Sequence, residues 1–130
     1  MKLGQLSEAA IYSKDLDAAQ KFYREVLGLE QISRMEDRGM AFRCGATVLL
    51  VFDAARTRIP DAGVPTHGAS GEGHIAFIIE QAEIEPWRGR LEEHGVAIEM
   101  ETEWPQGGRS IYFRDPDRNV VELAPPTLWL

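Results

Sequence analysis

The sequence predicts an α+β protein made of two tandem modules that share one order of elements, strand–helix–strand–strand–strand. Three observations predict this fold. Each half of the chain begins with a short apolar strand, continues with a helix that ends at a glycine, and then carries three strand-like segments. AFRCGATVLL at 41–50 matches YFRDPDRNVVE at 112–122 in its Phe-Arg pair, its turn and its valine-rich strand. Leu27-Gly28-Leu29 also matches His94-Gly95-Val96.

The first module is expected over about residues 1–53. Its first strand spans 5–13, and Asp15 is a candidate N-cap because its side chain can accept a hydrogen bond from a free N–H at the helix start. Apolar residues follow at helical spacing up to Gly28, which suits the left-handed position after a helix. Three further strands are expected at about 30–35, 39–44 and 47–53, with turns at 38–39 and 44–45.

A connector of about residues 54–72 follows, rich in Pro, Gly and other turn-forming residues. A loop of this length in a compact domain is usually functional or joins two units. The second module is expected over about 73–130. Because modules of about 60 residues bury little surface alone, the two must pack together as one domain of residues 1–130. The second module's elements are a strand at 73–80, a helix at 84–94, and strands at about 96–103, 109–114 and 119–124.

Composition excludes several classes of protein. The formal net charge of −7 over 130 residues argues against a nucleic-acid partner, which requires a basic surface. The longest apolar runs, such as VLLVF at 48–52, are too short to cross a bilayer, and no membrane association is expected. The N-terminal MKLGQLSEAA lacks the apolar core of a signal peptide, and the single cysteine, Cys44, rules out an internal disulfide. These features predict a cytoplasmic protein.

Three stretches, taken in this order, resemble the vicinal oxygen chelate superfamily: IYSKDLDAAQKFYREVLGLE, GHIAFII and YFRDPDRNVVEL. That superfamily includes glyoxalase I, extradiol dioxygenases, fosfomycin-resistance thiol transferases and bleomycin-resistance proteins. The resemblance covers nearly the whole chain. It implies a single glyoxalase-like domain whose two βαβββ modules form curved mixed sheets around a cup-shaped cleft. The scaffold serves many reactions, so the resemblance specifies the fold more tightly than the activity.

The resemblance also implies a metal site, because the family takes its ligands from the first and last strands of the modules. Carried over position by position, the ligands are Glu8, His74 and Glu122. Glu8 stands where the family usually has His, and a fourth position, used by glyoxalase I, falls near Leu50, which cannot bind metal. Alternation along each strand places all three candidates opposite the face best suited to cover a helix, so that one concave surface can collect them.

The rest of that surface is expected to be apolar and aromatic with few polar groups, as in small-molecule pockets. Alternation also assigns Met40 and Val48 to it. Ser110 and Tyr112 match substrate-contact positions of the fosfomycin enzymes, whereas Ala10 does not. The side chains expected to bind a substrate are Tyr12, Phe42, Leu50, Phe52, Ser110 and Tyr112.

Several of these residues also have a plain structural interpretation. A glutamate on a strand, such as Glu8, is most often solvated, and a lone histidine such as His74 is often a hydrogen-bonded core residue. Glu122 lies among apolar neighbours and needs a partner, which a metal or an arginine would supply. His67, in the connector, can reach the mouth of the cup, but loop histidines are usually solvated. Trp104 is expected to serve packing.

Two functions follow from this pattern. Two carboxylates and one imidazole suit a divalent metal such as Mn, Fe, Co, Ni or Zn, with positions left open to polarise a carbonyl or stabilise an enolate. The first function is therefore a metal-dependent lyase, isomerase or dioxygenase acting on a small, largely apolar, oxygen-bearing substrate. The second is a metal-free protein of the bleomycin-resistance type that sequesters a small molecule. Both imply a homodimer, since the family commonly completes each cup across two chains, and no residue can be assigned as catalytic acid or base.

Overall fold

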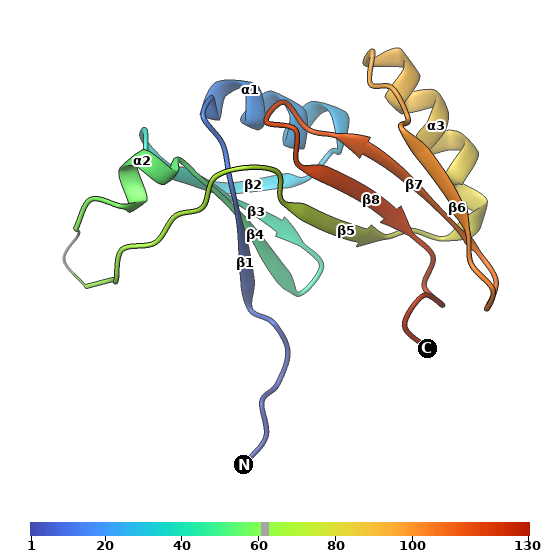
Figure 1. The fold of residues 1–130 in the computed structure, drawn as a ribbon, viewed down its shortest axis with the longest axis horizontal. Coiled ribbons are helices and arrows are strands. Elements are labelled where there is room, and N and C mark those ends of the chain that lie inside the picture. The colour runs from blue at the N-terminus through green and yellow to red at the C-terminus, as the bar shows by residue number, and fades with distance from the viewer. Residues whose placement is uncertain (61–62) are drawn as a thin grey trace. The chain divides into compact units, whose positions relative to one another are not determined.

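The computed structural model describes residues 1–60 and 63–130, and the chain divides into two compact units, residues 1–71 and residues 72–130. Each unit contains one four-stranded mixed sheet with helical segments (Figure 1). Both units have the element order βαβββ, which confirms the α+β fold predicted from the repeat. The grouping of both modules into one domain stays a prediction.

Unit 1 has its sheet in the order β1-β4-β3-β2, with β1 parallel to β4 and the other pairs antiparallel. Residues 54–57 of the expected connector form a short helix instead of a loop. The elements of this unit are β1 (Glu8–Tyr12), α1 (Leu16–Lys21), the π-helical segment η1 (Phe22–Val26), β2 (Glu30–Met35), β3 (Gly39–Cys44), β4 (Thr47–Phe52) and α2 (Ala54–Thr57).

The helix of unit 1 begins and ends where the sequence predicts. Asp15 has an extended backbone, and its carboxylate accepts a hydrogen bond of 3.1 Å from the N–H of Ala18, which satisfies one of the free donors at the helix start. After η1 the chain turns through Gly28, whose φ of +70° is a conformation that side chains with a Cβ rarely adopt.

Strand pairing decides which side chains share a face of the sheet. In unit 1 Ala10 pairs with Leu50 and Tyr12 with Phe52, so these four lie on the side of Glu8, as predicted. Phe42 does not lie on the side of Glu8. It pairs with Leu49 on the opposite face, is fully buried, and contacts the Tyr23 ring of η1 at 5.8 Å between centroids.

The placement of Phe42 and Met40 on the cup surface is therefore wrong. Alternation shows that the two share a face of β3, but not which face that is. The turn at Gly45 sets the register that pairs Ala41 with Leu50, so Ala41 takes the expected place of Phe42.

Unit 2 repeats the arrangement with its sheet in the order β5-β8-β7-β6, and β5 is parallel to β8. The second strand of this module begins at Met100, four residues later than the predicted start at about residue 96. The elements are β5 (His74–Ile78), the 3₁₀ turn η2 (Gln81–Glu83), α3 (Ile84–Glu93), β6 (Met100–Glu103), β7 (Arg109–Arg114) and β8 (Val120–Ala124).

The core of unit 2 lies on one face of its sheet. That face carries Ile111, Phe113, Val121 and Leu123, all with at most 2 % of their surface exposed, and α3 adds the buried Ile84 and Leu91. The other face carries His74, Ala76, Ser110, Tyr112 and Glu122, since Ala76 and Tyr112 both pair with Glu122.

The turn before β8 fixes the start of β5. Asp115 accepts backbone hydrogen bonds from Asp117 and Asn119, both of 2.9 Å, and so closes the turn. The Asn119 side chain then accepts a hydrogen bond of 2.7 Å from the N–H of Gly73, directly before His74. The two strands that carry His74 and Glu122 are thus joined by a side chain as well as by the sheet.

Across the described residues, no helix is long and apolar enough to span a bilayer.

Candidate metal and ligand-binding sites

His74 and Glu122 lie side by side on the open face of unit 2, which is the face of its sheet opposite the core. The Nε2 atom of His74 is 3.3 Å from Oε1 of Glu122. The His74 side chain is 53 % exposed, whereas that of Glu122 is 6 % exposed. The parallel pairing of β5 with β8 sets this distance, because Ala76, two residues after His74, is the register partner of Glu122.

The other ring nitrogen of His74 is hydrogen-bonded to the backbone. Nδ1 is 3.1 Å from the carbonyl oxygen of Val120. A carbonyl can only accept, so Nδ1 carries the proton of this hydrogen bond. In the neutral ring Nε2 then presents a lone pair to a carboxylate oxygen of Glu122. Two facing acceptors at 3.3 Å can share a proton, carried by either partner, or a metal ion.

Glu122 is held by neutral hydrogen-bond donors. Its Oε2 accepts a hydrogen bond of 2.6 Å from the Ser110 hydroxyl, and that hydroxyl accepts one of 2.8 Å from the indole N–H of Trp104. Ser110 is fully buried. Because an indole N–H can only donate, the single proton of Ser110 is committed to the carboxylate. A direct contact between Ser110 as donor and a ligand would require this bond to break.

Tyr112 flanks the pair from β7. Its ring lies 6.5 Å from the His74 ring, centroid to centroid, at an interplanar angle of 29°. Burial raises the pKa of the Tyr112 phenol, and the neighbouring Glu122 carboxylate raises it further. Tyr112 is therefore a neutral hydrogen-bonding group on the same surface as the histidine and the carboxylate.

These residues fit a divalent metal chemically. An imidazole nitrogen and a carboxylate oxygen face each other, and each ligand is oriented from behind, His74 by a backbone carbonyl and Glu122 by a hydroxyl. Imidazole and carboxylate ligands suit first-row metals. Within residues 1–60 and 63–130, no group of three or more His, Cys, Asp or Glu side chains forms a ready metal cage, so the pair offers two ligands.

The third predicted ligand, Glu8, lies in unit 1 and is exposed. It is the first residue of β1 and pairs with Val48, just as His74 is the first residue of β5 and pairs with Val120. The two residues thus occupy equivalent places in the repeat. Glu8 lines a cavity of about 810 Å³ whose lining also includes the predicted substrate residues Leu50 and Phe52.

The connector supplies a histidine to this cavity. Nδ1 of His67 lies 2.7 Å from the Tyr12 hydroxyl, and its ring meets Phe52 edge-on at 5.1 Å between centroids. His67 is exposed, as expected of a loop histidine, and it also lines this cavity. Nothing in the local sequence around His67 signals the contact, since it depends on how residues 63–67 return to the sheet.

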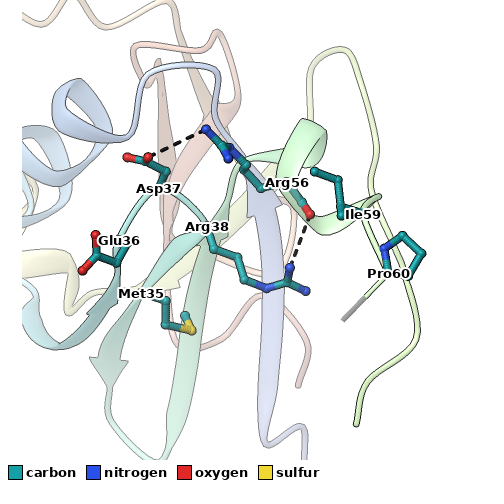
Figure 2. A pocket seen from close by; sticks show the side chains of 7 residues that line it. All are labelled: Met35, Glu36, Asp37, Arg38, Arg56, Ile59 and Pro60. Carbon is teal, nitrogen blue, oxygen red and sulfur yellow. Dashed lines mark hydrogen bonds and ion pairs between the residues drawn. The ribbon is translucent and has the colours of Figure 1, made fainter. Parts of the chain in front are cut away.

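A second, smaller cavity of about 390 Å³ adjoins the β2–β3 turn (Figure 2). Arg38 lines both cavities, and its guanidinium donates a hydrogen bond of 3.3 Å to the carbonyl oxygen of Arg56. Arg56 in turn lies 3.7 Å from the Asp37 carboxylate. Nothing in the sequence distinguishes Arg38, because an arginine in a turn ordinarily points into solvent.

Comparison with known proteins agrees with this architecture. The model of the glyoxalase/bleomycin resistance protein/dioxygenase superfamily matches residues 5–123, and the chain belongs to that superfamily. The chain is 34% identical over 125 residues to a protein named glutathione transferase FosA from Serratia marcescens, covering 93% of this chain and 80% of the relative. It is 30% identical over 131 residues to the fosfomycin resistance protein FosX of Listeria monocytogenes, covering 95% and 90%.

Solved structures show the same relationship. A structure described as lactoylglutathione lyase from Agrobacterium tumefaciens superposes with a TM-score of 0.93 at 39% identity, covering 99% of this chain and 98% of that one. The FosX structure from Listeria monocytogenes gives a TM-score of 0.74 at 26% identity, covering 98% and 97%. The chain is thus similar both to a lyase-like protein and to fosfomycin-resistance proteins.

Proposed function

We propose that the protein is a divalent-metal-dependent enzyme of the lyase, isomerase or dioxygenase type, with a metal held by His74, Glu122 and Glu8. The observation that carries the proposal is the pair of facing acceptors, His74 Nε2 and Glu122 Oε1, at 3.3 Å. Each is already oriented by a second hydrogen bond, so little order would have to be created on binding. Glu8 is included because of its equivalent place in the repeat.

The bound metal would supply Lewis-acid polarisation of substrate oxygens. The chain's own residues would orient and enclose the substrate. Tyr112 would present a neutral hydroxyl beside the two ligands, because its raised pKa keeps the phenol protonated. Leu50, Phe52 and Tyr12 are the proposed substrate-binding side chains of unit 1.

The names of the relatives suggest which substrates to test first. One relative is named a glutathione transferase, two are fosfomycin resistance proteins, and one solved structure is described as a lactoylglutathione lyase. We therefore propose fosfomycin with glutathione, and the glutathione hemithioacetal of methylglyoxal, as the first assays. Formation of the glutathione adduct or of lactoylglutathione would define the reaction type.

A metal-free binding protein is the second candidate. The same 3.3 Å contact is compatible with it, because a proton carried by either His74 or Glu122 would satisfy the pair with no metal. Glu8, in place of the usual histidine, is compatible with loss of the metal. In this case the protein would sequester a small, largely apolar molecule.

The two functions are separated by metal analysis of protein purified without chelator. The enzyme proposal expects about one Mn, Fe, Co, Ni or Zn per chain. It also expects Glu122→Gln, which has nearly the same shape, to weaken metal affinity more than tenfold while circular dichroism stays unchanged. Glu93→Gln, on the exposed surface of α3, is the matched control and should keep full affinity. Wild-type protein that neither contains nor takes up any of these metals would establish the binding-protein alternative.

Two broader expectations belong to the same proposal. We propose a cytoplasmic homodimer, as the superfamily resemblance and the lone Cys44 suggest. Light scattering coupled to size-exclusion chromatography tests the dimer, with an expected mass of twice 14.6 kDa. A monomer at micromolar concentration would contradict it.

A further inference from the structure

The cavity of unit 1 is lined by His67, which the proposed metal site does not use and which is hydrogen-bonded to Tyr12. The Tyr12 hydroxyl and Nδ1 of His67 are joined by a hydrogen bond of 2.7 Å. Tyr12 comes from the end of β1, and His67 comes from the connector 55 residues later. The surrounding cavity, of about 810 Å³, is otherwise lined mainly by apolar side chains and backbone, with Glu8 and Arg38 as its charged members.

The histidine is fixed in place from three directions. Its backbone N–H donates a hydrogen bond of 3.1 Å to the carbonyl oxygen of Thr57, a fully buried residue at the end of α2. Its ring rests edge-on against Phe52, which is 9 % exposed, and lies 5.9 Å from the Tyr12 ring. These contacts orient the ring of the exposed His67 towards the cavity.

The bond between the two side chains can be made with the tyrosine as donor. The phenol then gives its proton to Nδ1, and its oxygen retains lone pairs that can accept a hydrogen bond. A ligand hydroxyl that donates to the Tyr12 oxygen would extend the chain to ligand O–H, Tyr12 O–H and His67 Nδ1. Hydrogen bonds in such a chain polarise and strengthen one another.

The cavity also offers a cation for a negative group. Arg38 lines it, and the described contacts of its guanidinium comprise one hydrogen bond to a backbone carbonyl. In residues 1–60 and 63–130 it forms no ion pair with a carboxylate. A guanidinium has five N–H donors, so donors remain to bind a carboxylate, and a two-pronged contact suits that geometry.

We propose that this cavity binds a small hydroxy acid, with its hydroxyl on the Tyr12–His67 pair, its carboxylate on Arg38, and its apolar part against Leu50, Phe52 and Pro65. This deepens the proposed function, since it names a substrate class and two residues that select it, but it requires no metal. Tyr12 and His67 discriminate ligands that carry a hydroxyl from those that lack one, because an unmatched polar group in a cavity is costly.

The test uses two probes that differ only in the hydroxyl, 3-phenyllactate and 3-phenylpropionate. Binding is measured by calorimetry on chelator-treated protein, so that a failure of the metal proposal does not affect the result. Wild-type protein should bind 3-phenyllactate more tightly. Tyr12→Phe should weaken 3-phenyllactate about tenfold and leave 3-phenylpropionate unchanged, since it removes the hydroxyl contact alone. Glu93→Gln, on the exposed surface of α3, is the control and should alter neither affinity.

Two further variants keep the proposal open to refutation. His67→Gln should reproduce the selective loss of Tyr12→Phe, and Arg38→Gln should weaken both probes to a similar degree. Circular dichroism of each variant establishes that it is folded. The proposal would be overturned if wild-type protein bound neither probe. It would also be overturned if Tyr12→Phe weakened the binding of both probes equally. Loss of metal from Glu122→Gln with unchanged probe selectivity would support it independently of the metal site.

Discussion

At the scale of single residues, the surroundings of Glu122 show how a buried carboxylate is kept in one orientation. Glu122 has no arginine or lysine partner among the described residues; its neighbours are a hydroxyl, an imidazole and a phenol. A neutral hydrogen bond stabilises a charge less than an ion pair does, but it leaves the carboxylate its negative charge for a cation that arrives later. This suits a ligand for metal better than a structural salt bridge would.

Removal of the Ser110 hydroxyl tests this arrangement. Ser110→Ala leaves the indole N–H of Trp104 and Oε2 of Glu122 without their partner inside the protein, so we expect the free energy of unfolding to fall by about 1–3 kcal/mol. Urea denaturation measures the change. Ser33→Ala, on the exposed β2, should stay within about 0.5 kcal/mol of wild type. Equal stability of the two variants would contradict the role of Ser110.

Part of this residue-scale detail could be predicted from the sequence. Strand alternation and the repeat predicted that His74, Glu122, Ser110 and Tyr112 share a face, and pairing across β5, β8 and β7 confirms it. The bond from Trp104 to Ser110 could not be predicted, because it depends on the path of the loop before β7. For the same reason the contact between His67 and Tyr12 was missed.

At the scale of elements, the close approach of β3 to β4 positions the cavity wall of unit 1. Gly39 is buried at the start of β3, and a Cβ there would collide with the Phe52 ring and lie 2.7 Å from the carbonyl oxygen of Val51. Phe52 in turn supports the ring of His67. A glycine thus allows an aromatic side chain to reach the place where it holds the histidine.

We expect Gly39→Ala to lower the free energy of unfolding by about 1–3 kcal/mol, because the ring and the backbone of β4 must both shift. Gly89→Ala is the control: it lies on the exposed side of α3 with nothing within 4 Å of the new Cβ, and should raise stability by about 0.5–1 kcal/mol. Thermal unfolding of both variants measures these opposite changes. A Gly39→Ala protein as stable as wild type would show that β4 can shift without lowering the free energy of unfolding.

The elements themselves were largely predictable. Five strands, at 30–35, 39–44, 47–52, 109–114 and 120–124, lie within one residue of the sequence-based limits at either end. The face of Phe42 was not predictable, because alternation within β3 leaves two choices that only the register with β4 resolves. The start of β6 was also misplaced, since Val96 and Ile98 resemble strand residues but are half-buried outside the sheet.

At the scale of the whole molecule, duplication explains the fold and part of the proposed chemistry. Both units place one edge strand parallel to the last strand of the same module, and both begin that edge strand with a candidate metal ligand. The repeat could be recognised in the sequence because turns and Phe-Arg pairs recur in the same order. The substrate could not, since one scaffold serves many reactions.

Metal binding should stabilise the molecule as a whole. A ligand that binds the folded chain alone, at 100 times its Kd, adds about 2.7 kcal/mol to the free energy of unfolding. We therefore expect the melting temperature of chelator-treated protein to rise on addition of Mn, Ni or Zn, and to fall again with excess chelator. His74→Ala should abolish the rise. The same rise in the variant would mean that the metal binds elsewhere.

The alternation of side chains along β8 has a consequence for insertions and deletions. Glu122 reaches the open face because it stands an even number of residues from Val120, the partner of His74. One residue added between Val120 and Glu122 would turn the carboxylate into the core and expose a valine or leucine, while two added residues would restore its side. Exposed loops such as the one around Gln106 have no such constraint. Length changes in homologous chains should therefore collect in loops and avoid this strand.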